Sequence, residues 1–494
     1  MQPTTSVTFA EPLRKKPMMR PLLFTLALLA AGLLTAQDGY RITVNIDGYE
    51  EEYLRIANNL LDKQYLVDTA YRTDAGTYVF RDDTTALPRG IYLVVLSPEN
   101  NYFQMVVGDD PDQEFTLTTS MDNLNRVEVT GSQENELFYD YLAFLDERGK
   151  EVKDHYAVIQ DSTSSAADRA AAQAKADAVT ARVEAEQERL QTQHPEAFIS
   201  AVIRTNRSAD IPEEYDLIVD SDERNRKSLA WLRAHYFDNI DLKDDRLLRT
   251  PFLFGRMEYY TDKLFVQHPD SVATAVDYIL GQMDPRSELF KHYVSHFTNK
   301  AATSDIVGMD GLYVHMIDNY YKKGLAYWAD PDQLAKMVEN ADKTRPLLIG
   351  KVAPDIKMKR RDGSDVTLHE LSNKYTILYF WQFACGSCKK STPVMKEFYA
   401  KWKDKGVEIF SICTKQREID KCWEYIDEQE IGEWLHVTDP YMRFYKEYEI
   451  TSTPTIFVLD ENKVIISKRI GAKQLDELLT AYEEQERLLG SEGE

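Results

Sequence analysis

The chain has little of several features that mark common protein classes. Cysteine is scarce, with four among 494 residues, which is too few for a disulfide-stabilised scaffold. Basic residues are outnumbered, with 59 Lys and Arg against 82 Asp and Glu, so the formal charge is −23. A field of that sign repels phosphate backbones and anionic lipid surfaces. We therefore expect no nucleic-acid partner.

Long apolar runs are also missing. The run at residues 22–34, interrupted only by Thr25, is shorter than the about 20 residues that a helix needs to cross a bilayer. Basic residues between positions 14 and 20 precede it, and Leu34-Thr35-Ala36 follows. This order is typical of a secretory signal peptide. Residues 1–36 are predicted to be a signal cleaved after Ala36, which makes the mature chain periplasmic, without a stable membrane span. An uncleaved signal that anchors the chain is the alternative.

What the chain does contain fits folded domains. Hydrophobic residues make up 43% and charged residues 29% of the sequence, and the length corresponds to about two to four domains. From residue 37 to 132, apolar and polar residues alternate, as in Tyr40 to Ile46, and similar runs recur as far as Val129. Turn sequences separate these runs. We expect an antiparallel β-sandwich of about seven or eight strands. It contains no histidine or cysteine, so a packing or partner-binding role is expected.

Residues 133–348 show helical spacing of apolar residues, which predicts an all-α domain. Within it, residues 166–185 are rich in alanine and predict a solvated helix that buries little. His292 and His296 would share one helix face, the spacing of a metal pair. No third ligand is apparent, so no metal site is expected.

Residues 349–494 alternate predicted strands with predicted helices. The apolar runs at 376–381, 407–412 and 455–459 are strands, and the spans 387–404, 417–429 and 472–489 are helices. This order predicts an α/β domain with parallel strand pairs and helices on its faces. Sites in such sheets lie beyond the carboxyl ends of the strands.

A cysteine pair stands at one of these ends, in Cys385-Gly386-Ser387-Cys388. It follows a predicted strand and opens a predicted helix, where the exposed amides and helix dipole favour a thiolate. Cys385 is therefore predicted to be the attacking sulfur, and Cys388, one helical turn along, to resolve a mixed disulfide. The small residues Gly386 and Ser387 allow close approach at this corner.

In these features the segment resembles the thioredoxin family, in particular its exported TlpA/ResA-like branch. Ala353-Pro354-Asp355, the pair Phe380-Trp381 and the Thr453-Pro454 dipeptide before an apolar strand match that pattern. The resemblance implies a thioredoxin fold and a thiol-disulfide oxidoreductase that needs no cofactor. It also implies that Trp381 packs under the dithiol, and that Thr453 and a cis Pro454 present backbone to substrate. The upstream regions are similar to the β-rich and helical domains of Bacteroides-type exported proteins.

The sequence departs from the family pattern at several positions. Tyr379 stands where many thioredoxins have a buried acidic proton acceptor, so the group that deprotonates Cys388 is not identified. Ala384 replaces the usual Trp, and Ser387 replaces the usual Pro between the cysteines. The reducing or oxidising direction therefore stays open.

Other interpretations of the cysteines were weighed. A zinc site needs a second ligand pair, and Cys413 with Cys422 does not have zinc-knuckle spacing. A peroxidase would have Thr three residues before the first cysteine, where this chain has Gln382. Cys413 and Cys422 could form a structural disulfide, remain as two buried thiols, or relay electrons to the cysteine pair.

The sequence therefore predicts an exported thiol-disulfide oxidoreductase that exchanges disulfides with protein substrates and an unidentified redox partner. The alternative is a partner-binding or assembly protein that uses its thioredoxin fold mainly as a scaffold.

Overall fold

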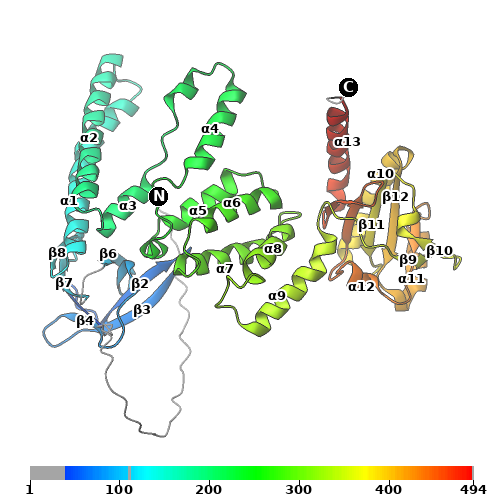
Figure 1. Ribbon diagram of the computed structural model, residues 1–494, viewed down its shortest axis with the longest axis horizontal. Helices are drawn as coiled ribbons and strands as arrows, with labels where there is room; N and C mark the ends of the chain where they lie inside the picture. The colour runs from blue at the N-terminus through cyan, green and yellow to red at the C-terminus, as the bar shows by residue number, and fades with distance from the viewer. Residues whose placement is uncertain (1–38, 109–112, 492–494) are drawn as a thin grey trace, which may run out of the picture. The chain divides into compact units, whose positions relative to one another are not determined.

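A computed structural model describes residues 39–108 and 113–491, and its elements are labelled in Figure 1. The predicted signal peptide, residues 1–36, lies outside the described residues. The chain divides into two compact units. One contains the described residues up to Leu264 together with Gln282–Leu289, and the other contains Phe265–Gly281 and the described residues from Phe290 onward.

The first unit begins with strands, as the alternation predicts. They are β1 (Tyr40–Asp47), β2 (Tyr53–Leu60), β3 (Lys63–Tyr71), β4 (Tyr78–Asp82), β5 (Gly90–Leu96), β6 (Asn101–Val107), β7 (Glu114–Ser120) and β8 (Asn123–Thr130). Within the described residues they form two four-stranded sheets, ordered β4-β1-β7-β8 and β3-β2-β5-β6. Tyr40, Ile42, Val44 and Ile46 are buried on one face of β1.

One strand pairing differs from the predicted antiparallel arrangement. Strands β1 and β7 are parallel, with Ile42 opposite Phe115 and Val44 opposite Leu117. The prediction of purely antiparallel sheets was wrong here, because alternation specifies which face of a strand is buried but not the direction of its neighbour.

Helices follow the strands in the first unit. They are α1 (Gln133–Gln160), α2 (Ala166–Gln193), α3 (Phe198–Asn206), α4 (Ser221–His235) and α5 (Leu253–Lys263). Asn135 joins the start of α1 to β6, because its buried side chain bonds both the N–H and the carbonyl of Val106, at 2.8 and 2.7 Å. The alanine-rich segment is α2, which lies beside α1 (Figure 1) and buries few of its side chains.

The second unit contains the rest of the helical region and an α/β domain. Its helices before residue 349 are α6 (Pro269–Gly281), α7 (Glu288–Ala302), which starts at the boundary between the units, α8 (Asp310–Met316) and α9 (Pro331–Thr344). The division into β-sheets, a central helical region and a C-terminal α/β domain confirms the predicted fold class. The boundaries at residues 132 and 348 stay predictions.

The α/β domain is built on a five-stranded sheet ordered β13-β12-β11-β14-β15. These strands are β11 (Tyr375–Trp381), β12 (Val407–Cys413), β13 (Leu435–Val437), β14 (Thr455–Leu459) and β15 (Ile465–Lys468), and a separate hairpin pairs β9 (Lys357–Lys359) with β10 (Asp365–Thr367). Its helices are α10 (Gly386–Trp402), α11 (Ile419–Glu428), α12 (Phe444–Glu447) and α13 (Leu475–Ser491). Strands β11 and β12 are parallel, whereas β14 runs antiparallel to β11.

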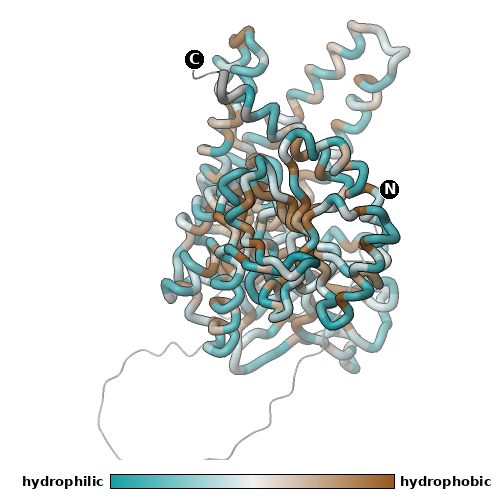
Figure 2. Tube along the Cα trace, turned by 90° about the vertical axis from the view of Figure 1, so that its right-hand side faces the viewer, coloured by the Kyte–Doolittle hydropathy of each residue, from teal (hydrophilic) through white to brown (hydrophobic). Residues whose placement is uncertain are grey.

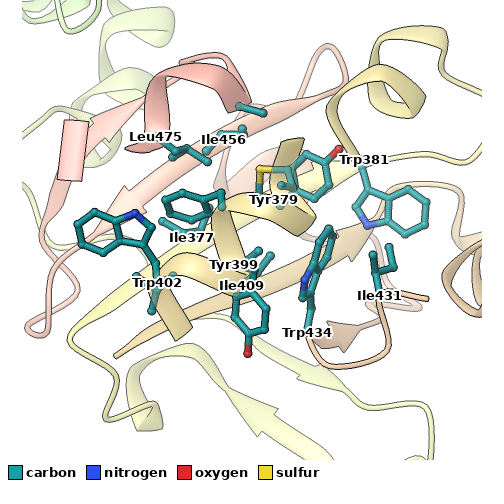
Figure 3. Packing of buried hydrophobic residues seen from close by; sticks show 14 of the residues in the cluster. Ile377, Tyr379, Trp381, Tyr399, Trp402, Ile409, Ile431, Trp434, Ile456 and Leu475 are labelled. Carbon is teal, nitrogen blue, oxygen red and sulfur yellow. The ribbon is translucent and has the colours of Figure 1, made fainter. Parts of the chain in front are cut away.

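The central strand β11 is buried on both faces. Ile377, Tyr379 and Trp381 belong to one core with residues of α10, α11 and α13 (Figure 3), and Leu378 and Phe380 belong to the core on the other face. In Figure 2, apolar stretches lie on the strands at the centre of the domain that faces the viewer, and hydrophilic stretches lie around them. A central strand with helices and loops on both faces holds its carboxyl end rigidly, which suits a site there.

Candidate functional site

The cysteine pair lies at the corner between β11 and α10. Cys385 is the N-cap of α10, and its Sγ accepts a hydrogen bond from the N–H of Cys388 at 3.2 Å. In a helix the first amide groups have no partner within the helix. A sulfur in this position satisfies one of them and is stabilised as an anion.

The environment makes Cys385 the more acidic thiol. Partial burial raises its pKa, but hydrogen bonds from the side chain and backbone of Cys388 oppose this effect, and the net pKa is lowered. The thiol also lies 3.3 Å from the carbonyl oxygen of Thr453, to which it donates when protonated. Cys385 is only partly buried, so a substrate disulfide can reach its sulfur.

Cys388 has the opposite environment. Its side chain is fully buried, and burial together with the neighbouring Cys385 sulfur raises its pKa. The two thiols thus differ in both exposure and acidity. This asymmetry suits an attacking cysteine and a resolving cysteine that stays protonated until it is needed.

The Thr453-Pro454 dipeptide lies against the dithiol, although it is remote in sequence. The peptide bond between these residues is cis. Gln382, which follows β11, donates from Nε2 to the Thr453 hydroxyl at 2.9 Å. The loop before β14 is therefore attached to the dithiol corner by a side-chain bond and by the Cys385 contact with the Thr453 carbonyl.

Trp381 is buried at the end of β11 and supports the site from below. Its ring lies 5.3 Å from the ring of Tyr425 on α11, and Tyr425 donates to the Thr392 hydroxyl at 3.2 Å. Thr392 in turn donates to the carbonyl of Cys388 at 3.0 Å. Trp381 and the backbone of Cys388 are therefore linked through α11, a connection that motif spacing does not reveal.

A buried polar chain holds the indole of Trp381. Its Nε1–H donates to Ser411 Oγ at 2.8 Å, and Ser411 lies 3.0 Å from Nδ1 of His436. Because Nε2 of His436 faces the carbonyl of Ile431 at 2.7 Å, Nε2 carries the proton and Nδ1 accepts from Ser411. Burial lowers the pKa of His436 to about 4. Sequence reasoning missed Ser411 and His436, and the one available signal was a polar residue inside an apolar strand.

Tyr379 occupies the position of the acidic group found in many relatives. Its side chain is buried, and its hydroxyl has no hydrogen-bond partner within the described part of the chain. Burial and the nearby Cys388 sulfur raise its pKa further. Tyr379 therefore cannot act as the base for Cys388 near neutral pH.

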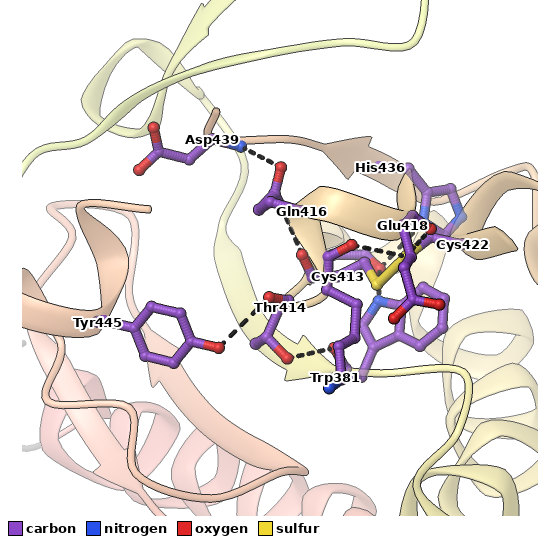
Figure 4. Close-up of a disulfide and its surroundings, with 11 residues drawn as sticks. Trp381, Cys413, Thr414, Gln416, Glu418, Cys422, His436, Asp439 and Tyr445 are labelled. Atoms are coloured by element: carbon purple, nitrogen blue, oxygen red, sulfur yellow. Dashed lines mark hydrogen bonds between the residues drawn. A yellow bond between two sulfur atoms is a disulfide. The ribbon is translucent and has the colours of Figure 1, made fainter. Parts of the chain in front are cut away.

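The remaining two cysteines are joined. Cys413, the last residue of β12, forms a disulfide with Cys422 on α11, with Cα atoms 6.4 Å apart (Figure 4). Cys413 lies opposite Trp381 in the parallel pairing of β11 and β12. Of the three arrangements considered for these cysteines, the structure contains the disulfide. It ties α11, which carries Tyr425, to the sheet.

Neither a metal-ligand cluster nor a membrane-spanning helix is found among the described residues. Within residues 39–108 and 113–491, no three His, Cys, Asp or Glu side chains are grouped so that they could hold a metal ion. On α7, His296 packs against the ring of Phe297, with ring centroids 5.3 Å apart. In the same part of the chain, no helix combines the length and apolar character needed to cross a bilayer.

Comparison with known proteins agrees with this geometry. Residues 349–468 match the model of the AhpC/TSA family, and residues 173–344 match a domain of unknown function, DUF5106. Thiol-disulfide oxidoreductase ResA of Bacillus cereus (strain ZK / E33L) is 31% identical over 142 residues, which are 29% of this chain and 80% of that protein.

Solved structures include similar chains. A domain of a possible thiol-disulfide isomerase from Cytophaga hutchinsonii is 37% identical, with a TM-score of 0.28, covering 29% of this chain and 98% of that chain. A thioredoxin-like protein from Bacteroides caccae is 16% identical, with a TM-score of 0.37, covering 56% of this chain and 98% of that chain.

The sheet order and the dithiol at the start of α10 define the C-terminal part as a thioredoxin-like domain. The chain belongs to the family of thiol-disulfide oxidoreductases that includes ResA.

Proposed function

We propose that this protein exchanges disulfides with protein substrates through the Cys385–Cys388 dithiol. The observation that carries the proposal is the asymmetry of the pair. Cys385 is accessible, accepts a hydrogen bond from a helix amide and has a lowered pKa, while Cys388 is buried with a raised pKa. A pair of free thiols with these properties is equipped for exchange rather than for stapling the fold.

The reduction of a substrate would take two steps. The Cys385 thiolate attacks one sulfur of the substrate disulfide, forming a mixed disulfide and releasing the other sulfur as a thiolate, which takes up a proton. Cys388 then loses its proton and attacks Sγ of Cys385, which releases the second substrate thiol and leaves a Cys385–Cys388 disulfide. The substrate gains two electrons and the dithiol loses them, and the reverse sequence oxidises a substrate.

The surrounding groups have supporting roles in this proposal. The Thr453 backbone beside Cys385 would pair with an extended substrate segment, and Trp381 would hold the floor of the site. The chemistry requires no cofactor. The group that accepts the Cys388 proton is a water or a carboxylate elsewhere in the protein, because the buried Tyr379 hydroxyl cannot serve as that base near neutral pH.

Insulin reduction by the full chain with dithiothreitol as the electron source tests the proposal. Wild type should accelerate precipitation of the insulin chains, and Cys385→Ser should lose that acceleration. Mixed with insulin in the absence of dithiothreitol, reduced Cys388→Ser should instead accumulate a mixed disulfide, visible as a mass increase that a reductant removes. Equal activity of wild type and Cys385→Ser would contradict the proposal and favour the scaffold alternative.

We also propose that the chain works in the periplasm after removal of residues 1–36. The support is the sequence order of basic, apolar and small residues at its N-terminus, and a stabilising disulfide at Cys413–Cys422 suits an oxidising compartment.

A further inference from the structure

Exposed basic side chains occur in the two chain segments that leave the sheet at the edge where the dithiol lies. Lys389 and Lys390 follow Cys388 on the first turns of α10, and Lys415 and Arg417 lie between β12 and α11. All four side chains are exposed, and none forms a salt bridge or a side-chain hydrogen bond within the described residues. We call these four residues the basic rim.

The two parts of the rim leave the sheet at the same edge. Strands β11 and β12 are parallel, with Trp381 opposite Cys413. The N–H of Thr414 donates to the carbonyl of Trp381 at 2.7 Å, so the chain that leads to Lys415 starts beside the chain that leads to Cys385. In the first turn of α11, Lys421 Nζ lies 5.7 Å from the ring centroid of Phe383, which stands two residues before Cys385. This contact also brings the two segments together.

Acidic neighbours do not cancel this charge. Glu418 pairs with Lys421 at 2.6 Å and also interacts electrostatically with Lys415, and Asp420 and Glu424 are exposed nearby. The four rim residues together with Lys421 nevertheless outnumber these three acids. The rim therefore keeps a local positive excess on a chain whose formal charge is −23.

Exposed aromatic side chains continue the surface. Tyr445, 44% exposed, donates to the carbonyl of Thr414 at 3.3 Å (Figure 4), and Tyr441 is 81% exposed. The side chain of Gln416, which stands between Lys415 and Arg417, accepts a hydrogen bond from the N–H of Asp439 at 3.1 Å. This bond connects the rim to the segment that carries Tyr441 and Tyr445. Tyrosine and arginine on one surface are typical of protein interfaces.

We propose that the basic rim docks acidic polypeptide segments, in which Asp or Glu residues flank the disulfide that Cys385 attacks. The inference rests on the proposed function and specifies its substrate class. An acidic segment is attracted to the rim and repelled by the rest of the chain, so the field both speeds the encounter and orients the substrate toward the dithiol.

The test uses the full chain and three disulfide substrates. Two are cystine peptides of equal length that differ only in having Asp or Lys beside each cysteine, and the third is uncharged hydroxyethyl disulfide. At low ionic strength, the pre-reduced wild type, which supplies two electrons for a single turnover, should reduce the acidic peptide with a second-order rate constant about tenfold above that for the basic peptide. The ratio should approach one in about 1 M salt, where the Debye length is about 3 Å.

Charge-reversal variants locate the effect. Lys415→Glu with Arg417→Glu should abolish or invert the ratio, as should Lys389→Glu with Lys390→Glu. Comparing the two peptides on one variant cancels any change in the intrinsic reactivity of Cys385. The control is Lys403→Glu with Lys405→Glu, which makes the same charge change just beyond the other end of α10. Because Lys403 pairs with Glu433 at 2.9 Å and Lys405 lies over the Trp402 ring, this variant must first reduce hydroxyethyl disulfide at the wild-type rate, and it should then keep the wild-type ratio.

The outcomes separate the two proposals. Equal rates on both peptides, with hydroxyethyl disulfide still reduced by wild type and not by Cys385→Ser, would overturn the docking inference and leave the proposed function standing. A preference that the rim variants retain, or that the control loses equally, would also overturn it. Failure to reduce any of the three substrates would refute the proposed function, and the inference with it.

Discussion

At the scale of single residues, the reactivity of the site depends on how two chemically identical thiols are distinguished. Cys385 accepts a bond from the amide of Cys388 at 3.2 Å, whereas Cys388 lies in the core with Trp381 and Tyr379. Hydrogen bonding favours the thiolate of the first cysteine, and desolvation disfavours the thiolate of the second. These two environments are the basis for the roles proposed for the two thiols.

The lowered pKa of Cys385 can be measured by alkylation. In the reduced protein, the iodoacetamide rate at Cys385 should rise with a midpoint below about 8.5, the value of an unperturbed cysteine. Cys388→Ala removes a side-chain hydrogen bond that lowers this pKa, so the midpoint should move to higher pH. A wild-type midpoint at or above that of a model thiol would refute the assignment.

His436 should make stability depend on pH. Its pKa is lowered to about 4 in the folded protein, against about 6.5 when unfolded. As pH falls from about 6.5 to 4, the unfolded state binds a proton that the folded state does not. Folding stability should therefore fall by about 3 kcal/mol across this range.

Urea denaturation of wild type and His436→Gln between pH 4 and 7.5 measures that contribution. The variant lacks the titrating ring, so its stability should be lower at pH 7 but less steeply dependent on pH. If the free energy of unfolding depends on pH equally in the two proteins, protonation of His436 does not destabilise the fold and the prediction is wrong.

At the scale of elements, α11 is the part that connects the site to the second disulfide. Cys422 fixes α11 to the end of β12, and Tyr425 from the same helix contacts Trp381 and Thr392. The loop that this disulfide closes is short, with a sequence separation of 9. The disulfide therefore removes only a modest amount of conformational entropy from the unfolded chain. In the folded chain it holds α11, and with it Tyr425, beside Trp381.

Replacing both Cys413 and Cys422 with Ala should lower the free energy of unfolding by about 2–3 kcal/mol, as expected for closing a loop of this length. The measurement is best made in a background carrying Cys385→Ser and Cys388→Ser. There, a reductant should destabilise the parent protein and leave the Ala variant unchanged. Equal sensitivity of both proteins to the reductant would contradict a stabilising disulfide.

At the scale of the whole molecule, the dithiol chemistry occupies one region of a longer chain. The AhpC/TSA match covers residues 349–468, and the helical region before it matches a domain of unknown function. The described N-terminal sheets carry no histidine or cysteine. The overall charge of −23 disfavours polyanionic partners. The basic rim is a local region of positive charge on this acidic chain.

Export should leave a defined N-terminus. Expressed in a Gram-negative host, the mature protein should be recovered from the periplasm, and its N-terminal sequence should begin at Gln37. A membrane-bound product that retains the residues before Ala36 would instead support the uncleaved anchor.

Much of the architecture could be predicted from local sequence patterns. Alternation in Tyr40–Asp47 predicted a half-buried strand, and the order of apolar and helical runs predicted that Cys385 stands at a strand-to-helix corner. The parallel pairing of β1 with β7 could not be predicted, because it depends on chain direction and not on burial. The short strands β13 and β15 also lacked a usable signal, since each is only three or four residues long.

The sequence by itself determined that two thiols lie one helical turn apart at a helix N-terminus, because this arrangement follows from neighbouring residues. Only the tertiary structure decided what surrounds them. Thr453 is 68 residues from the sulfur it contacts, and Ser411 is 30 residues from the indole it holds. Such contacts arise when the sheet packs distant segments together, and local patterns carry no record of which segments will meet.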